Sequence, residues 1–152
     1  MQSTRRVLRI KVLQVLYAYE IANDPIEKVK KDIISDLQDA EKYKFASDLI
    51  DNVLKNIKKL DAIIKGKIEH WEFERIALID KLVLRIGLTE LLYFPEIPPK
   101  VSINEAIEIA KSFCTNQSGK FVNGILDSIL IDMRNDNTLD KQGRGLLDIK
   151  KK

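Results

Sequence analysis

Cationic and aromatic side chains at two places in the sequence form the combination that binds single-stranded nucleic acid. Three arginines with no acidic neighbour stand near the N-terminus: Arg5, Arg6 and Arg9. Far along the chain, Lys120 is followed directly by Phe121. Cations neutralise phosphates, and flat side chains stack on unpaired bases. A structural explanation stays open for both groups, since surface arginines also solvate a helix and a phenylalanine is more often buried.

No set of side chains in the sequence fits catalysis. The chain lacks a glycine-rich phosphate loop, a GxSxG turn and an HExxH motif. His70 is the only histidine and Cys114 the only cysteine, which excludes an internal disulfide and a His/Cys metal cluster. We therefore expect a binding protein rather than an enzyme, with no cofactor and no metal.

The charge is unevenly distributed along the chain. The net charge of +3 is too small to indicate a partner by itself. Residues 1–19 contain four cations and no acid, and residues 141–152 contain five cations and one acid. Residues 69–80 contain four acids and one cation. Two basic ends and an acidic middle segment predict two kinds of partner, one anionic and one basic.

Apolar residues recur at helical spacing through most of the sequence, and no stretch shows the alternation of a strand. We predict an all-α fold of about seven helices in two packed subdomains that divide near Gly66. The predicted helical ranges are 4–23, 25–37, 43–66, a short helix or turn within 67–76, 77–94, 103–114 and 119–133. The range 77–94 is apolar on nearly every side, which predicts the most buried helix, with Gly87 permitting close packing.

Three prolines separate the helix 77–94 from the next one: Pro95, Pro98 and Pro99. They fix φ and remove backbone donors, so no helix continues through them. Ser102 and Glu105 then fit a capping box, and Ser118 marks the start of the last helix. Lys120 and Phe121 should therefore stand where a polar loop enters a helix.

The length corresponds to one helical domain, which we expect over residues 1–134 and which carries the candidate RNA-binding residues. Beyond Arg134 the periodicity is lost, which predicts a flexible basic tail over 135–152. No apolar stretch approaches the roughly 20 residues of a membrane span, and the N-terminus lacks the features of a secretory signal. We expect a cytoplasmic protein without a membrane partner.

Two stretches of the sequence resemble the NusB family, the bacterial transcription antitermination factors. They are KVSINEAIEIAKSF at 100–113 and GKFVNGILD at 119–127. The resemblance extends back through IDKLVLRIGLTELLYF at 79–94 to RRVLRIKVLQVLYAYE at 5–20, and covers the chain to about Leu130. It implies an all-α fold of two small helical subdomains.

The resemblance also implies an RNA site. In the family, the arginine-rich N-terminal segment and the loop before the last helix contact boxA RNA, a short single-stranded antitermination signal. The matching residues here are Arg5, Arg6, Arg9, Gln117, Lys120 and Phe121. Gln117 and Gly119 depart from the acidic residue and the histidine common at these positions. Loss of an acid beside a phosphate path favours RNA binding.

A protein partner is implied as well, namely NusE, a small-subunit ribosomal protein. The matching positions are Tyr17, Glu74, Asp80 and Arg85. Acids at helix starts are also explained by the helix dipole, and Arg85 is expected to pair with Asp80 if it has no partner-binding role.

We therefore predict a transcription antitermination factor that pairs with NusE, binds boxA of ribosomal RNA transcripts and affects RNA polymerase through assembly alone. One alternative is the RNA-binding domain of a ribosomal RNA methyltransferase, although these 152 residues contain no cofactor-binding α/β unit. The other is a helical module that binds protein only. The resemblance is also compatible with a homodimer.

Overall fold

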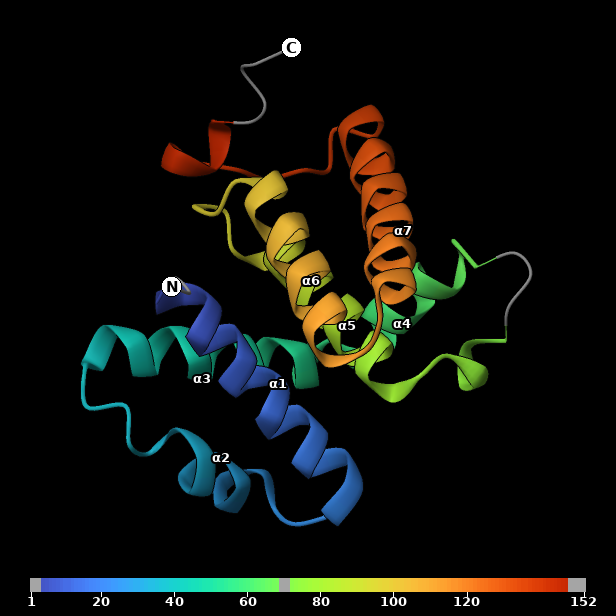
Figure 1. Cartoon of the computed structure of the whole chain (residues 1–152). Helices are drawn as coiled ribbons and strands as arrows, with labels where there is room; N and C mark the ends of the chain where they lie inside the picture. Colours follow the sequence, from blue (N-terminus) through green and yellow to red (C-terminus); the bar gives the residue numbers. More distant parts are fainter. Residues whose placement is uncertain (1–3, 69–71, 148–152) are drawn as a thin grey trace. The chain divides into compact units, whose positions relative to one another are not determined.

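The computed structural model describes residues 4–68 and 72–147, in which the regular structure is entirely helical (Figure 1). The α-helices are α1 (Thr4–Ala22), α2 (Ile26–Ile34), α3 (Ala40–Lys55), α4 (Ile57–Lys65), α5 (Leu78–Tyr93), α6 (Pro99–Phe113) and α7 (Asn116–Asn135). Two 3₁₀ helices are η1 (Phe73–Arg75) and η2 (Gly143–Leu146). The predicted all-α fold is confirmed. His70 lies outside the described residues.

The helix predicted over 43–66 is in fact two helices, because Asn56 interrupts it. Asn56 has φ −109° and ψ 16°, outside helical values, and its carbonyl accepts a hydrogen bond from Leu60 N at 2.9 Å. Asparagine is a favoured residue at such a helix start. The chain forms two compact units, unit 1 within residues 1–55 and unit 2 within 56–152. Their boundary therefore lies at this break and not near Gly66.

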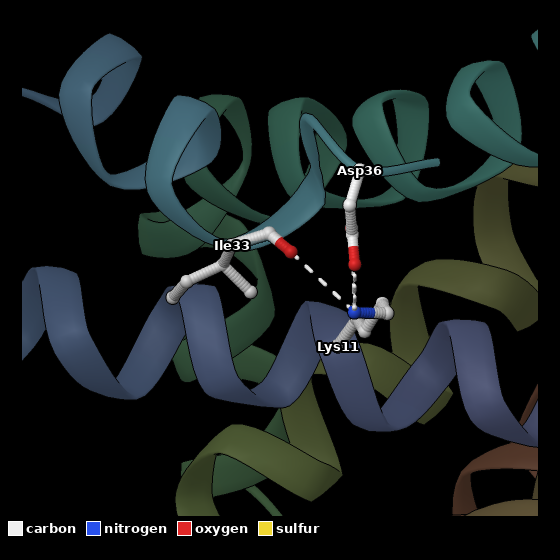
Figure 2. A network of polar contacts seen from close by, with 3 residues as sticks. All are labelled: Lys11, Ile33 and Asp36. Atoms are coloured by element: carbon white, nitrogen blue, oxygen red, sulfur yellow. Dashed lines mark hydrogen bonds and ion pairs between the residues drawn. The ribbon is translucent and has the colours of Figure 1, made fainter. Parts of the chain in front are cut away.

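Unit 1 consists of α1, α2 and α3, with α1 packed against both others. The buried side of α1 carries Leu8, Val12, Val15 and Leu16, as its spacing predicts. Lys11 reaches from α1 to the C-terminal end of α2. Its Nζ lies 3.5 Å from the carbonyl oxygen of Ile33 and 3.4 Å from a carboxylate oxygen of Asp36, which follows the helix (Figure 2). A cation at a helix C-terminus satisfies exposed carbonyls and complements the dipole.

Unit 2 is built around α5, which packs against α4, α6 and α7. Every residue from Leu82 to Leu91 is buried, so the prediction of the most buried helix is confirmed. Gly87 lets the helices approach closely. A Cβ at this position would lie 2.8 Å from Leu126 Cδ1 of α7 and 3.4 Å from Ala106 Cβ of α6.

Helix α6 begins at Pro99, four residues earlier than predicted, and Ser102 is not its cap. Proline is well suited to the first turn of a helix, because its missing N–H has no partner to lose there and its φ is already helical. Ser102 instead lies within the helix and is buried, and its Oγ donates to Glu90 Oε1 of α5 at 2.8 Å. The predicted capping box is therefore an α5–α6 contact.

The segment after α7 is anchored on unit 2 as far as the structure describes it. Lys141 is buried, and its Nζ donates to the carbonyls of Glu90 at 3.2 Å and Phe94 at 2.9 Å. Gln142 N donates to Pro95 O at 2.9 Å. The tail predicted to be flexible from residue 135 thus contains an anchored part, which holds the C-terminal end of α5. Residues 148–152 lie outside the described residues.

Gly145→Ala is expected to release this anchored segment. Gly145 is buried, and a Cβ there would overlap the carbonyl oxygen of Pro95, a backbone atom that cannot turn aside. Such overpacking typically costs about 1–3 kcal/mol, so trypsin should cleave after Arg144 roughly ten times faster. Gly124→Ala is the control, because a Cβ at Gly124 meets no atom within 4 Å. Equal cleavage of both variants would show that the close fit at Gly145 does not hold the segment.

Candidate nucleic-acid interface

The arginines of α1 differ in their exposure. Arg5 is exposed and its Cζ lies 3.9 Å from the centroid of the Phe45 ring of α3, while Arg6 is half-buried. Arg9 is only 3% exposed and lies 5.6 Å from the same ring centroid. Cations over an aromatic face stabilise the α1–α3 packing. The expectation of three surface arginines is therefore corrected, because Arg9 belongs to the packing of unit 1.

Tyr17 lies on the accessible side of α1. Its side chain is 42% exposed, and Ile21, one turn later on the same side, is 62% exposed. Tyr17 is thus available to a partner, as its predicted role requires.

Helix α7 begins at Asn116, three residues before the predicted start, because Thr115 caps it. Thr115 has extended backbone angles, and its Oγ1 accepts a hydrogen bond from Ser118 N at 3.1 Å. Threonine is a favoured N-cap residue, since its oxygen satisfies an N–H that has no partner within the helix. Gln117 and Ser118 consequently belong to the first turn of α7 and not to a loop.

A chain of hydrogen bonds joins this turn to the start of α5. Thr115 Oγ1 donates to Ser118 Oγ at 3.4 Å, and Ser118 Oγ donates to Asp80 Oδ2 at 3.2 Å. Asp80 lies in the first turn of α5 and is 8% exposed. Its position near a helix N-terminus is favourable for a carboxylate. The contact fixes the two helix starts against each other within unit 2.

A cavity of about 570 Å³ lies between these helix starts and the segment before α5. Its lining residues are Arg75, Ile76, Ala77, Asp80, Thr115, Gln117, Ser118, Lys120 and Phe121. We call it the α5–α7 pocket. Gln117 and Lys120 are exposed, and Phe121 is half-buried. The pocket therefore brings together all three predicted RNA-binding residues of α7 and one residue predicted to bind a protein partner, Asp80.

Glu74 is exposed in η1, next to Arg75 of the pocket wall. Phe73 anchors this segment, since its ring is buried and lies 4.9 Å from Lys81 Nζ and 5.0 Å from Lys65 Nζ. Arg75 forms an ion pair with Glu72 at 3.3 Å, and both side chains are largely exposed. Surface pairs of this kind contribute about 0–1 kcal/mol, so Arg75 can exchange Glu72 for another anion at little cost.

Arg85 is not a surface residue, and it pairs with Asp61 rather than with Asp80. It is 6% exposed, and its Nε and Nη2 donate to Asp61 Oδ1 at 2.8 Å and Oδ2 at 2.9 Å. This bidentate geometry, typical of strong arginine–carboxylate pairs, joins α4 to α5. Arg85 therefore contributes to the packing of unit 2, while its partner-binding role stays a prediction.

The α5–α7 pocket has the chemistry of a binding site. Lys120 and Arg75 supply positive charge, Phe121 supplies a flat ring, and Ile76 and Ala77 supply apolar surface. This composition suits a phosphate together with an unstacked base. Among residues 4–68 and 72–147, no group of three or more side chains is arranged to hold a metal ion. No helix in the same part of the chain is long and apolar enough to cross a membrane.

Sequence reasoning found the α7 residues of the pocket and Asp80, but it did not place them in one site. Thr115 and Ser118 have the spacing of a capped helix start, which would have placed the start of α7 correctly. The contact between Asp80 and Ser118 spans 38 residues and leaves no local pattern in the sequence.

A family model and a sequence relative each match most of the chain. The model of the NusB family matches residues 6–130. The chain belongs to the NusB family. The transcription antitermination protein NusB of Chloroherpeton thalassium is 45% identical over 148 residues, which cover 96% of this chain and 70% of that protein. Relatives of this chain in the NusB family are thus named transcription antitermination proteins.

Solved structures of NusB proteins have the same fold. T. maritima NusB matches with a TM-score of 0.80 and 36% identity over 87% of this chain and 94% of that one. A crystal structure of antitermination factors NusB and NusE in complex with dsRNA matches with a TM-score of 0.77 and 24% identity, over 87% of this chain and 99% of that one. At 24% identity this second likeness concerns the fold.

Proposed function

We propose that this chain is a cytoplasmic transcription antitermination factor that pairs with NusE and binds boxA RNA in ribosomal RNA transcripts during elongation. The observation that carries the proposal is the α5–α7 pocket, where Gln117, Lys120 and Phe121 meet at one helix start. Membership of the NusB family supports it, as does the existence of a protein of the same fold in a complex with NusE and dsRNA.

The proposed mechanism is assembly, in which neither partner is chemically changed. Arg5 and Arg6 of unit 1 and Lys120 of unit 2 contact phosphates, and Phe121 stacks on a base. Tyr17 and Glu74, both exposed, contact NusE. Asp80 is largely buried and bonded to Ser118, so it contributes less accessible surface to a protein partner than Glu74 does. The assembled complex then acts on elongating RNA polymerase.

A gel-shift experiment with boxA RNA, with and without NusE, tests the proposal. We expect a shifted complex in the presence of NusE that weakens as salt rises, because phosphate contacts release counterions. A complex with NusE that never retains RNA, at any salt concentration, would contradict the proposal and favour a module that binds protein only.

Arg5→Ala combined with Arg6→Ala is expected to weaken this RNA complex and its salt dependence. The slope of log K against log salt is negative for RNA binding. Removal of one phosphate-binding cation should reduce its magnitude by about 0.7, so removal of two should reduce it by about 1.4. Arg9 is left intact because it is buried. The control is Lys28→Ala with Lys44→Ala, which removes two exposed cations of unit 1. If both double variants have the wild-type slope, α1 does not contact RNA.

A further inference from the structure

The outer face of α4 carries lysines that the fold leaves without counter-charges. Lys58, Lys59 and Lys65 are exposed, and none of the three forms an ion pair with a described residue. The one acid in the sequence of α4 is Asp61, whose two carboxylate oxygens accept hydrogen bonds from Arg85. The outer face of α4 is therefore a surface of uncompensated positive charge, which attracts an anionic partner.

The stability of α4 does not account for the positions of Lys58 and Lys59. Both lysines lie in the first turn of the helix, which contains no acid. A cation at a helix N-terminus opposes the helix dipole, so the two lysines are slightly unfavourable to the helix itself. Lys59 Nζ lies 5.6 Å from the centroid of the Tyr93 ring of α5, which favours one position of its side chain. A bound anion explains this pair of cations better than the folding of α4 does.

A cavity of about 470 Å³ adjoins these lysines within unit 2. We call it the α4–α7 pocket, because its lining comes mainly from α4 and from the C-terminal end of α7. Lys59 supplies a cation to the lining, Leu92 and Met133 supply apolar surface, and Asp136 and Thr138 supply hydrogen-bond acceptors. The pocket therefore combines a positive charge, apolar surface and accessible acceptors at one place.

This combination matches a nucleotide of a single strand. Its phosphate suits the lysines, its flat base suits the apolar surface, and an amino group of the base suits an acceptor. Asp136 and Thr138 are both exposed, so a base in the pocket can reach them. Asp132, the other acid of the lining, forms an ion pair with Lys67, which reduces its repulsion of a phosphate. The volume lies within the usual range of small-molecule sites.

We propose that the lysine face of α4 and the α4–α7 pocket form a second RNA-binding surface, which holds nucleotides that flank boxA. The inference rests on the RNA binding proposed above and adds a contact surface apart from the start of α7. Asp136 follows Phe121 by 15 residues, which is about 22 Å along a helix. A strand bound at Phe121 therefore reaches the α4–α7 pocket only if it continues beyond boxA.

A protein or a membrane is a less suitable partner for this face. Lysine is depleted in protein interfaces, whose energetic centres are bulky aromatic and arginine side chains. Helix α4, which is described over its whole length, presents no large exposed apolar side chain. The exposed residues among its lysines are small, namely Ala62 and Gly66. A helix that lies on a membrane instead inserts large apolar side chains.

The test compares boxA RNA with boxA RNA that carries a flank on its 5′ or 3′ side, long enough to follow the whole of α7. Binding to the full chain with NusE is measured by fluorescence anisotropy at several salt concentrations. We expect the flank on one side to tighten binding about tenfold. Lys58→Ala, Lys59→Ala and Lys65→Ala combined should remove this gain and reduce the magnitude of the salt slope for the flanked RNA by about 2. The affinity for boxA RNA alone should be unchanged.

Two further variants define the surface. Lys28→Ala, Lys31→Ala and Lys44→Ala combined remove three exposed lysines of unit 1 and should keep the gain from the flank. Ala62→Trp places a large side chain at an exposed residue of the pocket lining and leaves the lysines intact. It should lower the gain while the salt slope stays nearly constant, because the base loses its place and the phosphates keep theirs.

Each alternative result has a definite meaning. A flank that adds no affinity on either side, or a gain that the α4 variant retains, would overturn the second surface and leave boxA binding in place. An equal loss in the unit 1 variant would also overturn it, because any three lysines would then suffice. An unchanged gain in Ala62→Trp would exclude the pocket from the surface. If the α4 variant loses association with NusE in the absence of RNA and retains the gain, its lysines bind a protein. No binding of boxA RNA, with or without a flank, would overturn both proposals.

Discussion

Asp61→Ala is expected to lower the free energy of unfolding by about 3 kcal/mol. Asp61 supplies both carboxylate oxygens to Arg85, whose side chain is only 8% exposed. Removal of one partner of a buried ion pair leaves the other charge desolvated without its counter-charge, and this penalty exceeds the value of the intact pair. Urea unfolding, monitored by circular dichroism, measures the change as a shift of the midpoint concentration, with an unchanged slope of the free energy against urea concentration.

The control for this experiment is Glu108→Ala, which breaks an ion pair with Lys111 whose side chains are 45% and 43% exposed. We expect a change of about 0.5 kcal/mol or less there. Arg85→Met in the Asp61→Ala background should recover most of the stability, because an apolar side chain of similar length needs no counter-charge. An Asp61→Ala protein as stable as the Glu108→Ala protein would show that the Arg85 pair contributes little to unit 2.

Helical periodicity was sufficient to predict the fold, because most of the core is made by residues at regular spacing. The stripe of α1 and the apolar character of α5 on every side are local properties of the sequence, and the structure buries both as expected. The boundaries were predicted less well. Asn56 divides a continuous apolar stripe by its backbone angles alone, and Pro99 starts a helix where its residue type was interpreted as a break.

The two misplaced arginines show how residue type can mislead. Arg9 stands on the same helical face as Val12, Leu13 and Leu16, so the period itself indicated burial. Its charge nevertheless favoured a surface interpretation. Arg85 lies within the wholly buried run of α5, and its counter-charge Asp61 is 24 residues away in the sequence. The burial of both residues could be predicted, but the partner of Arg85 could not.

The α5–α7 pocket could be predicted only in part. Lys120 and Phe121 are adjacent in the sequence, so their combination of charge and ring is visible there. Asp80 joins them through the packing of α5 against α7, which depends on contacts distant in sequence, and Arg75 lies in η1, just before α5. The sequence assigned Asp80 and Phe121 to different partners, whereas in the structure both line a single pocket.

Phe121→Ala is expected to weaken binding of boxA RNA, in the presence of NusE, by about 1–3 kcal/mol, which is roughly 5- to 150-fold in the dissociation constant. Phe121 is half-buried and lines the α5–α7 pocket beside Lys120. Loss of the ring removes a surface for base stacking and leaves the cations in place. The affinity should therefore fall while the salt dependence of binding stays nearly constant, and anisotropy titrations at several salt concentrations separate the two effects.

Two further variants separate stacking from a general effect on stability. Phe121→Leu keeps apolar volume in the pocket without a flat ring, so it should preserve the unfolding midpoint and still lose RNA affinity. Phe113→Ala removes a phenylalanine that is 45% exposed at the end of α6 and does not line the pocket, and it should bind RNA as the wild type does. If Phe121→Leu binds boxA RNA with wild-type affinity, the ring does not stack on a base, and the positive charge of Lys120 and Arg75 is then the main contribution of the pocket to RNA binding.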